Sequence, residues 1–389
     1  MHTQDTPPEG KKIENPRAMA LKLTHFAATA SFLATLLVLR LLPTVVSVPV
    51  TVPSETSKLE SWIKSNMREF NDVSASKSID NALLIAENKA NVRVIKVKKD
   101  GTGDFKTITD AVKSVPSGNT KRVIIKIGGG EYREMVKVDR SKPFITFYGE
   151  PGNMPIISYD GTAKKFGTWY CATVTVESNY FVAVNIAFVN SAPAPDPRKN
   201  DQQAVAMRIS GDKAAFHNCK FIGFQDTLCD DMGRHFFRDC YIQGTVDFIF
   251  GNGKSVYLGT TINSVAKGLG VITAQGRQNV DDNSGFVFLH CKILGTGDTY
   301  LGRAWRKTPR VVFAYTDMGT LIDKQGWSNI ASGQTQKDMY YGEYKCKGPG
   351  STPAGRVKYA KTLSDAEAEP FLSMTFIQGN KWLLAPPRL

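Results

Sequence analysis

Four short segments of the chain place carboxylate, amide and guanidinium groups inside otherwise apolar stretches. They are QAVAMR (203–208), GFQDTL (223–228), GTVDFIFG (244–251) and YLGRAW (300–305). Together they supply Gln203, Gln225, Asp226, Asp247 and Arg303. An aspartate inside the apolar run VDFIF costs free energy when it is buried, unless a hydrogen bond or an opposite charge compensates it. Two carboxylates, two amides and one guanidinium indicate acid–base or nucleophilic catalysis.

Other common catalytic arrangements are missing from the sequence. There is no GxSxG nucleophile elbow, and the GKS at 253–255 lacks the upstream glycine of a phosphate-binding loop. The five histidines form no HExxH or other ligand pair, and no CxxC pair occurs. We therefore expect no metal site and no cofactor, so that the chemistry depends on carboxylates, amides and arginine.

An internal repeat indicates the elements that hold these groups. Three stretches share an aromatic residue, a cysteine three positions on and a glycine four positions further: FHNCKFIG (216–223), FRDCYIQG (237–244) and FLHCKILG (288–295). Looser copies are FVAVNIAF (181–188), YLGTTINS (257–264) and FAYTDMGT (313–320). A repeat length near 20 residues with occasional insertions is typical of a strand solenoid whose turns stack on one another. Because only one Asn-Gly hairpin dipeptide occurs, we prefer a parallel β-helix to a β-sandwich.

The same repeat places the two aspartates relative to one another. Asp226 lies seven residues after Cys219, and Asp247 lies seven residues after Cys240. On a regular solenoid the two carboxylates then stack on adjacent turns, about 4.8 Å apart. Two carboxylates so close do not both ionise easily, so the pKa of one should rise. This arrangement predicts a general acid beside a nucleophile.

A structural interpretation of these residues stays open at this point. Asp226 would then cap a turn, and Asp247 would neutralise Arg303 in a buried ion pair. Gln203 and Gln225 would only close hydrogen bonds within turns. The sequence alone does not separate this interpretation from the catalytic one.

The six cysteines divide into two groups. Cys219, Cys240 and Cys291 share one position of the repeat, and we expect them to form an interior ladder of buried thiols. The other three stand outside that position: Cys171, Cys229 and Cys346. The sequence leaves open whether any of these three forms a disulfide.

The N-terminal region has the layout of an export signal. Residues 26–39 are apolar or small throughout, basic residues precede them, and an arginine and a proline end the apolar run. The run is shorter than the roughly 20 residues that a membrane span needs. We therefore expect residues 1–50 to be a signal peptide or signal-anchor region.

The rest of the chain divides into a lead-in and a main domain. Residues 51–92 are expected to form an exposed lead-in with two short helices, within 57–70 and 78–88. From Arg93 onward, short alternating apolar runs flanked by turn residues predict strands. Residues 93–389 are therefore expected to form the all-β domain.

Composition and charge narrow the choice of partner. Apolar residues make up 42% of the chain, which excludes wholesale disorder. The chain carries 49 Lys+Arg against 36 Asp+Glu, a net charge of +13 at pH 7. A secreted protein this basic favours a polyanionic partner. The export signal and the lack of a dense Lys/Arg run disfavour nucleic acid and favour an acidic polysaccharide.

These motifs, in this order, resemble those of the plant pectin methylesterases, the carbohydrate esterases that demethylate homogalacturonan in the cell wall. The matching pieces are GDFKTITDAV (103–112), GEYRE (130–134), QAVAMR (203–208), GFQDTL (223–228), RDCYIQGTVDFIFG (238–251) and LGRAW (301–305). The resemblance implies a right-handed parallel β-helix, catalysis without a metal, and pectin as the substrate. It also implies a secreted, monomeric cell-wall enzyme of the subgroup without an N-terminal inhibitor-like pro-region, with proteinaceous pectinesterase inhibitors as further partners.

The resemblance assigns roles to the residues of these motifs. Asp247 matches the nucleophile, and Asp226 matches the general acid that later acts as a base. Gln203 and Gln225 match the oxyanion donors, and Arg303 matches the residue that orients Asp247. The aromatic residues at positions where the family has cleft walls are Trp305, Phe250, Tyr300, Trp327 and Trp169.

Two departures from the family pattern concern the cleft and its motifs. Cys229 replaces the tyrosine that commonly follows QDTL, so we expect this thiol to line the cleft. LGRAW replaces LGRPW, a mild change that keeps Arg303 and Trp305. Two rival functions remain: another β-helix pectin enzyme, such as a calcium-dependent lyase or a polygalacturonase, and a catalytically inactive wall-binding module.

Overall fold

The computed structural model describes residues 50–67, 79–88, 92–196, 198–328, 338–387 and 389. The chain divides into two units, Met1–Val48 and Pro49–Leu389, and the described residues all belong to the second. The signal predicted for residues 1–50 therefore lies, except for its last residue, outside the described part. Within that part, no helix combines the length and the apolar character that a membrane crossing requires.

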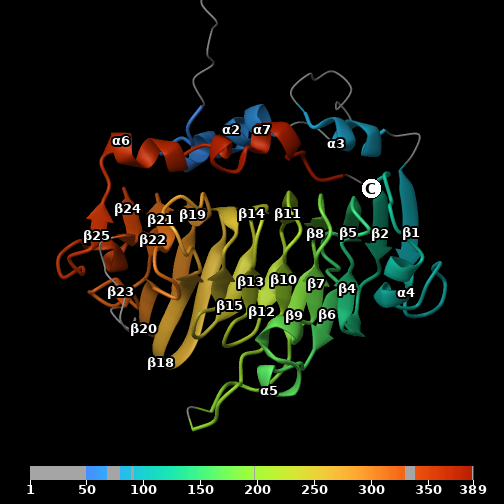
Figure 1. Ribbon diagram of the computed structural model, residues 1–389, viewed down its shortest axis with the longest axis horizontal. Coiled ribbons are helices and arrows are strands. Elements are labelled where there is room, and N and C mark those ends of the chain that lie inside the picture. Colours follow the sequence, from blue (N-terminus) through green and yellow to red (C-terminus); the bar gives the residue numbers. More distant parts are fainter. Residues whose placement is uncertain (1–49, 68–78, 89–91, 197, 329–337, 388) are drawn as a thin grey trace, which may run out of the picture. The chain divides into compact units, whose positions relative to one another are not determined.

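The β-domain is a parallel β-helix with three faces, which confirms the predicted fold (Figure 1). The first face is an 11-stranded sheet in the order β1-β2-β5-β8-β11-β14-β17-β19-β21-β24-β25. The second and third faces join into one 14-stranded sheet through the long strand β18 (Thr261–Gln275). The start of β18 pairs with the second face and its end with the third, so this strand turns the corner between them.

The strands are short, as the alternating apolar runs predict. Those of the first face are β1 (Arg93–Val97), β2 (Val123–Ile127), β5 (Ile145–Gly149), β8 (Val182–Val184), β11 (Ala214–His217), β14 (Arg234–Arg238), β17 (Lys254–Leu258), β19 (Gly285–Leu289), β21 (Arg310–Ala314), β24 (Tyr340–Tyr344) and β25 (Ala360–Thr362). Those of the second face are β3 (Glu131–Arg133), β6 (Ile156–Tyr159), β9 (Ala187–Asn190), β12 (Lys220–Ile222) and β15 (Tyr241–Gly244). Those of the third face are β4 (Val136–Val138), β7 (Val174–Val176), β10 (Met207–Ile209), β13 (Leu228–Asp230) and β16 (Ile249–Gly251). The last turns add β20 (Lys292–Arg303), β22 (Asp317–Met318) and β23 (Trp327–Ser328).

The aromatic position of the repeat forms a continuous ladder inside the β-helix. Neighbouring strands bring Phe216, Phe237, Tyr257, Phe288 and Phe313 into direct register. Successive ring centroids lie 4.8, 4.5, 4.5 and 4.4 Å apart, and every ring is fully buried. Stacked rings bury large apolar surfaces and help to fix the register of each turn.

For the repeat copy at 181–188, the strand register predicted from the sequence was wrong, because the repeat aligned Phe181 with Phe216. Ala183, and not Phe181, pairs with Phe216. The error is two residues, and side chains two apart on a strand point to the same face. Phe181 is therefore also fully buried, and the apolar pattern alone could not reveal the shift.

The predicted burial of the three ladder cysteines is confirmed, and a fourth, half-buried cysteine occupies the same repeat position. Cys219, Cys240 and Cys291 are each at most 2% exposed. Cys346 follows β24 by two residues, as Cys291 follows β19, so its assignment outside the repeat was wrong. Glu343 replaces the aromatic residue of that copy, which hid the repeat in the sequence. All six cysteines are free thiols.

A short helix covers the N-terminal end of the β-helix. Helix α4 (Ile108–Lys113) begins after Thr107, whose side chain accepts a hydrogen bond from the backbone of Asp110. The carboxylate of Glu134 accepts two more, from the backbone nitrogens of Ile108 and Thr109 at 3.0 and 2.9 Å. These bonds satisfy the free N–H groups of the helix end. The apolar side of α4 packs on the interior cluster and closes the solenoid.

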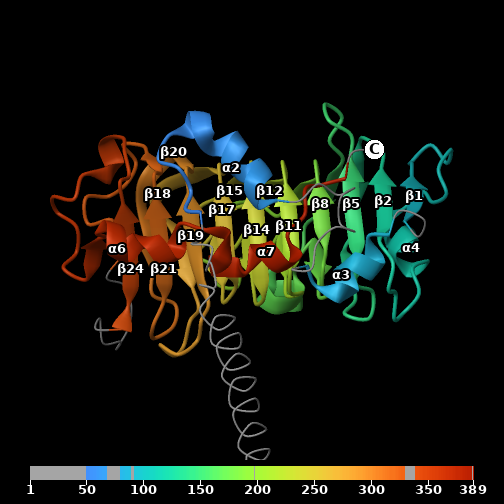
Figure 2. The same ribbon diagram turned by 90° about the horizontal axis from the view of Figure 1, so that it is seen from above.

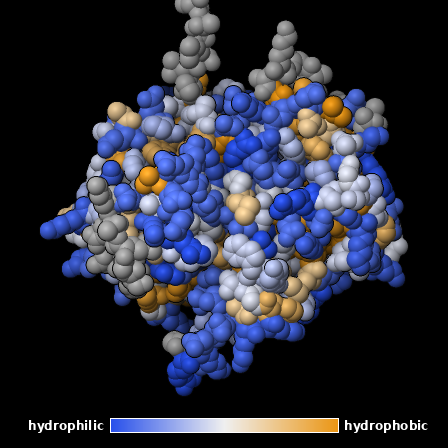
Figure 3. Space-filling view, in the orientation of Figure 1, coloured by the Kyte–Doolittle hydropathy of each residue, from blue (hydrophilic) through white to orange (hydrophobic). Residues whose placement is uncertain are grey.

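The lead-in and the C-terminal segment cover the outer surface of the first face. Figure 2 shows α2 (Leu59–Asn66), α3 (Asn81–Ala86), α6 (Asp365–Ala368) and α7 (Gly379–Trp382) lying over its strands. Trp62 and Leu83 share one apolar cluster with Phe236 and Val287 of the sheet. The expectation of an exposed lead-in was therefore wrong, because its helices bury apolar side chains. The view in Figure 3 shows a mostly hydrophilic surface.

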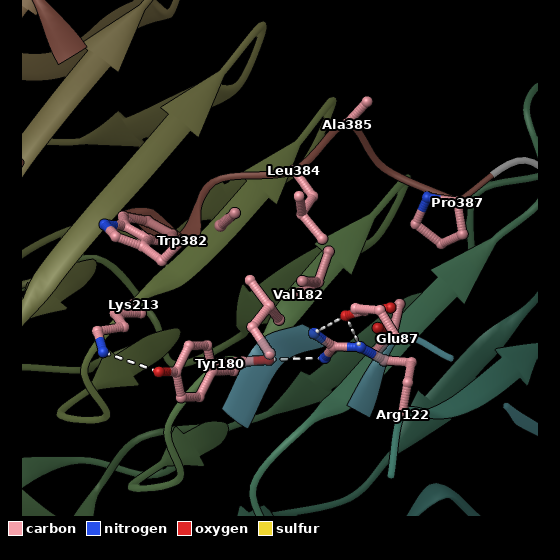
Figure 4. Close-up of a pocket in the computed structure, with 12 residues that line it drawn as sticks. Glu87, Arg122, Tyr180, Val182, Lys213, Trp382, Leu384, Ala385 and Pro387 are labelled. Atoms are coloured by element: carbon pink, nitrogen blue, oxygen red, sulfur yellow. Dashed lines mark hydrogen bonds and ion pairs between the residues drawn. The ribbon is translucent and has the colours of Figure 1, made fainter. Parts of the chain in front are cut away.

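A buried ion pair fixes the end of α3 to the β-helix (Figure 4). Two guanidinium nitrogens of Arg122 donate to one carboxylate oxygen of Glu87 at 2.8 and 2.6 Å. A third donates to the carbonyl oxygen of Tyr180 at 2.7 Å. The two side chains are 3% and 1% exposed, so this pair has almost no access to water. It borders a cavity of about 20 Å³ beneath the C-terminal segment.

Candidate active site

The third face brings all five candidate catalytic residues to one place. Gln203 precedes β10, Asp226 precedes β13 and Asp247 precedes β16, and these three strands are neighbours in the sheet. β20 lies beyond β18 in the same sheet, and Arg303 is its last residue. Gln203, Asp226 and Asp247 converge because each precedes its strand at the same edge of the parallel sheet. Arg303 reaches them from the other end of its strand, because Gly302 pairs with Thr273 and Thr273 pairs with Ile249, two residues after Asp247.

These residues surround an open cavity of about 230 Å³. Its lining consists of Thr168, Trp169, Gln203, Gln225, Asp226, Asp247, Phe250, Ala274, Arg303 and Trp305. The structure thus assembles the five polar candidates with three of the five aromatic ones. Thr168 and Ala274 were not anticipated from the sequence. Ala274 could have been found from the register of β18, which places it directly beside Phe250.

The two aspartates occupy equivalent positions on adjacent turns. The backbone nitrogen of Asp226 donates to the carbonyl oxygen of Val246 at 3.1 Å, which joins the two turns. Both aspartates have left-handed backbones, with φ of 63° at Asp226 and 51° at Asp247. Aspartate tolerates this region better than most residues, and such strain persists only where the surrounding structure imposes it.

Arg303 holds Asp247 in a two-pronged ion pair. The Nε of Arg303 donates to Oδ1 of Asp247 at 2.7 Å, and its Nη2 donates to Oδ2. These charge-assisted hydrogen bonds fix the orientation of the carboxylate. The hydrogen bonding that Arg303 donates to Asp247 is also the main reason that the pKa of Arg303 rises.

Asp226 lies in a different environment from Asp247, without an arginine among the described residues that pairs with its carboxyl group. It is 8% exposed, and burial raises its pKa well above the usual range. The negative charge of Asp247 raises it further, while Arg303 opposes the shift. None of the described residues donates a hydrogen bond to this carboxyl group, so the role of a turn cap lacks the contact that it requires. Asp226 is therefore set up to carry a proton beside an ionised partner.

The two glutamines are held by their backbones and present their side chains to the cavity. The carbonyl oxygen of Gln203 accepts from Ala163 at 2.8 Å, and that of Gln225 accepts from Ala204 at 3.1 Å. The side-chain oxygen of Gln203 is buried and has no hydrogen-bond partner among the described residues. A buried acceptor without a partner costs free energy, so this side chain is not placed there to close a hydrogen bond within the turn.

Aromatic side chains form the walls of the cavity. Trp169 is 36% exposed on one side. Trp305 stands on another, edge-on to Phe250 with ring centroids 5.9 Å apart. The ring of Trp305 lies against Gly276, where an added Cβ would come within 3.0 Å of it. An alanine at position 276 would therefore require the ring of Trp305 to move by a few tenths of an ångström.

Trp327 and Tyr300 do not line the cavity. Trp327 is fully buried and stacks on Tyr341 inside the β-helix, with ring centroids 4.2 Å apart. The register explains the error, because Trp327 pairs with Gly302 while its neighbour Ser328 pairs with Arg303. One step along a strand reverses the face to which a side chain points. Tyr300 is half-buried outside the cavity lining.

The expectation that Cys229 lines the cleft was also wrong. Its thiol is 1% exposed and belongs to a small apolar cluster with Cys171, Val205 and Phe250. Phe166, from the segment that carries Trp169, packs against the same cluster. Burial raises the pKa of the Cys229 thiol well above its usual range. The sequence could not show that a distant loop covers this position.

The fold and the site together define a parallel β-helix with an open cavity that holds two aspartates in different environments. Among the described residues, no cluster of three or more His, Cys, Asp or Glu side chains is arranged to hold a metal ion. The sequence profile of the Pectinesterase family matches residues 94–380. The chain belongs to the pectinesterase family and is an ester hydrolase.

Individual relatives agree with this assignment. The chain is 48% identical to pectinesterase 2 of Olea europaea over 340 residues. This match covers 87% of this chain and 92% of the Olea europaea protein. Pectin methylesterase from carrot has a similar structure, with a TM-score of 0.71 and 34% identity over 76% of this chain and 97% of the other. A pectin methylesterase in complex with a hexasaccharide gives a TM-score of 0.66 and 29% identity over 75% and 98% of the two chains.

Proposed function

We propose that this protein hydrolyses the methyl esters of homogalacturonan and so releases methanol and pectate. The observation that carries the proposal is the pair of stacked aspartates in an open cavity. Asp247 is fixed by Arg303, and the pKa of Asp226 is raised. The related pectin methylesterase bound to a hexasaccharide supports an oligosaccharide as the ligand.

In the first step, the carboxylate of Asp247 attacks the carbonyl carbon of the methyl ester. Negative charge develops on the carbonyl oxygen, and the side-chain amides of Gln203 and Gln225 donate hydrogen bonds to it. Methoxide is a poor leaving group, so Asp226 transfers its proton to the departing oxygen and methanol is released. The products are an acyl–enzyme anhydride on Asp247 and an ionised Asp226.

In the second step, Asp226 acts as a base. It takes a proton from a water molecule that attacks the anhydride, which releases the galacturonic acid carboxyl group and restores the carboxylate of Asp247. The product acid then loses its proton to solvent. Asp226 then carries a proton again, so the cycle closes with no net change in the enzyme. The different environments of the two carboxyl groups allow each to start in the form that its role needs.

The surroundings of the site fit a sugar polymer. Trp169 and Trp305 offer flat apolar surfaces against which pyranose rings can pack, and the nearly buried Phe250 supports Trp305. The net charge of +13 suits an acidic polysaccharide. We further propose that residues 93–389 form the catalytic domain, and that residues 1–50 direct secretion to the cell wall. The enzyme would modify pectin there as a monomer, with proteinaceous inhibitors as further partners.

The test is methanol release from highly methylated pectin, with ultraviolet absorbance followed in the same samples. We expect methanol and new carboxyl groups in equal amounts, no unsaturated products, and the same rate after exhaustive chelation. Ultraviolet absorbance without methanol would identify a lyase instead. Pectin binding without any product would favour the inactive wall-binding module.

A further inference from the structure

A buried ion pair lies beside the cavity without lining it. Arg208 of β10 is 9% exposed, and Asp231, just after β13, is 4% exposed. The Nε and Nη2 of Arg208 donate to Oδ2 of Asp231 at 3.3 and 3.2 Å. The hydroxyl of Ser210 donates to the same oxygen at 2.6 Å. The proposed reaction uses neither charge, so the pair requires a separate explanation.

The guanidinium of Arg208 also holds Trp169 through two contacts. Its Nη1 donates to the backbone carbonyl oxygen of Trp169 at 3.2 Å. Its central carbon lies 4.6 Å from the centroid of the indole ring, within the range of a cation–π interaction. One contact fixes the backbone of Trp169 and the other supports its ring, which still lines the cavity.

The segment that carries Trp169 is anchored on either side of it, because Phe166 and Cys171 pack in the apolar cluster with Cys229. It consists of one-turn helices, α5 (Ala163–Phe166) and η4 (Thr168–Tyr170), which are too short to be stable alone. Its start is held by the backbone of Ala163, which donates to Gln203 at 2.8 Å. The contact with Arg208 therefore supplies an anchor close to the tryptophan itself.

We propose that Asp231 and Arg208 are positioning residues that hold Trp169 as a fixed aromatic platform for a sugar ring beside the reacting ester. Asp231 orients the guanidinium, and the guanidinium orients the indole. The pair would then control affinity for the polysaccharide and leave the chemical step unchanged. This inference rests on the proposed function and adds a determinant of substrate binding to it.

Chemistry favours arginine in this role. A planar guanidinium can donate in its plane to Asp231 and to the Trp169 carbonyl while its flat face covers the indole. A lysine ammonium would make at most a point contact. Asp231 lies two residues after Cys229.

The test compares Asp231→Asn, Trp169→Ala and the double variant, with methyl-esterified hexagalacturonate as the substrate. Asn is nearly isosteric with Asp and still accepts a hydrogen bond from Ser210. We expect the KM of each single variant to rise about 5- to 10-fold, the effect of one cation–π platform, while kcat stays within about twofold. The double variant should be no worse than Trp169→Ala, because both changes remove the same contact.

A second readout does not depend on turnover. Acrylamide quenching of tryptophan fluorescence, with Trp169→Phe used to subtract the other tryptophans, should show Trp169 more accessible in Asp231→Asn. Arg208→Lys should give the same increase, so the test survives if one variant fails to fold. Binding of the hexagalacturonate by calorimetry keeps the test valid even if the wild-type protein releases no methanol.

The matched control is Asp212→Asn. Asp212 pairs with Arg234 across two turns of the same β-helix, but neither residue lines the cavity. This variant should leave KM and Trp169 quenching unchanged. An Asp231→Asn protein with normal KM and normal quenching would overturn the inference. So would a fall in kcat at constant KM, or effects of Asp231→Asn and Trp169→Ala that multiply in the double variant.

Discussion

Asp226 and Asp247 share one position of the repeat and one backbone conformation, so their difference comes from side chains around them. Arg303 donates two hydrogen bonds to Asp247, whereas no described residue donates one to the carboxyl group of Asp226. Burial and the charge of Asp247 therefore raise the pKa of Asp226. A single arginine, placed at the end of β20, makes two equivalent residues chemically distinct.

The raised pKa of Asp226 predicts a pH dependence of stability. An unfolded aspartate ionises near about pH 3.9, whereas folded Asp226 keeps its proton to a higher pH. Between these two pKa values the folded state binds more protons, so the free energy of unfolding falls as pH rises through the folded pKa. Asn cannot ionise, so the Asp226→Asn variant does not lose this stability as pH rises. Its thermal midpoint should exceed that of the wild type at high pH and match it below about pH 3.9.

The control for this prediction is Asp281→Asn, at an exposed aspartate away from the cavity. Thermal midpoints measured across pH should be the same for this variant and the wild type. If the wild type and Asp226→Asn lose stability in parallel as pH rises, the raised pKa of Asp226 is contradicted.

The proposed oxyanion role predicts a specific loss at each glutamine. Gln203→Ala or Gln225→Ala should lower kcat for methanol release about 10²- to 10³-fold, the usual effect of removing one oxyanion donor. Gln243→Ala is a matched control, because Gln243 is half-buried and does not line the cavity. A loss no greater than that of the control would remove the two amides from the mechanism.

The sequence predicted the polar residues of the site well, but it predicted the aromatic residues and the cysteine around them less well. The five polar candidates could be identified from motif and repeat spacing, and the structure brings them together. The aromatic positions depend on which face of a strand a residue occupies, so Trp327 was misplaced by one step. Cys229 is packed against Phe166, which lies 63 residues earlier in the chain, and no local sequence pattern predicts such a contact.

At the scale of elements, the repeat predicted the β-helix because each turn depends on its neighbours for a core. The spacing of aromatic and cysteine residues was enough to predict the register of most turns. The register failed at Phe181, where a shift of two residues preserves the buried face. The packing of the lead-in could not be predicted, because it depends on contacts such as that of Glu87 with Arg122, 35 residues apart in the chain.

The Glu87–Arg122 pair predicts how firmly the lead-in is attached. Arg122→Gln leaves Glu87 buried without its partner, so the free energy of unfolding should fall by about 3–5 kcal/mol. Lys58→Gln tests an exposed pair with Glu55, and should change stability by about 0–1 kcal/mol. Denaturant unfolding measures both. Equal, small effects would show that α3 is not held by this ion pair.

The whole molecule is basic, and this predicts a different salt dependence for substrate and product. Pectate is a polyanion, whereas highly methylated pectin carries little charge. The Debye length falls from about 30 Å at 0.01 M salt to about 8 Å at 0.15 M. Inhibition by added pectate should therefore weaken as salt rises, while the KM for highly methylated pectin changes little. Inhibition that is independent of salt would argue against attraction by the net charge of +13.

The most direct test of the account is Asp247→Asn, with methanol release and the thermal midpoint measured on the same protein. Asn preserves the shape of the side chain but removes the nucleophile, and Arg303 is 29% exposed, so its charge stays partly solvated. We predict a folded protein with a thermal midpoint close to that of the wild type and no detectable methanol release. A variant that melts much earlier but keeps its specific activity while folded would contradict the catalytic role of Asp247 and leave it as the structural partner of Arg303.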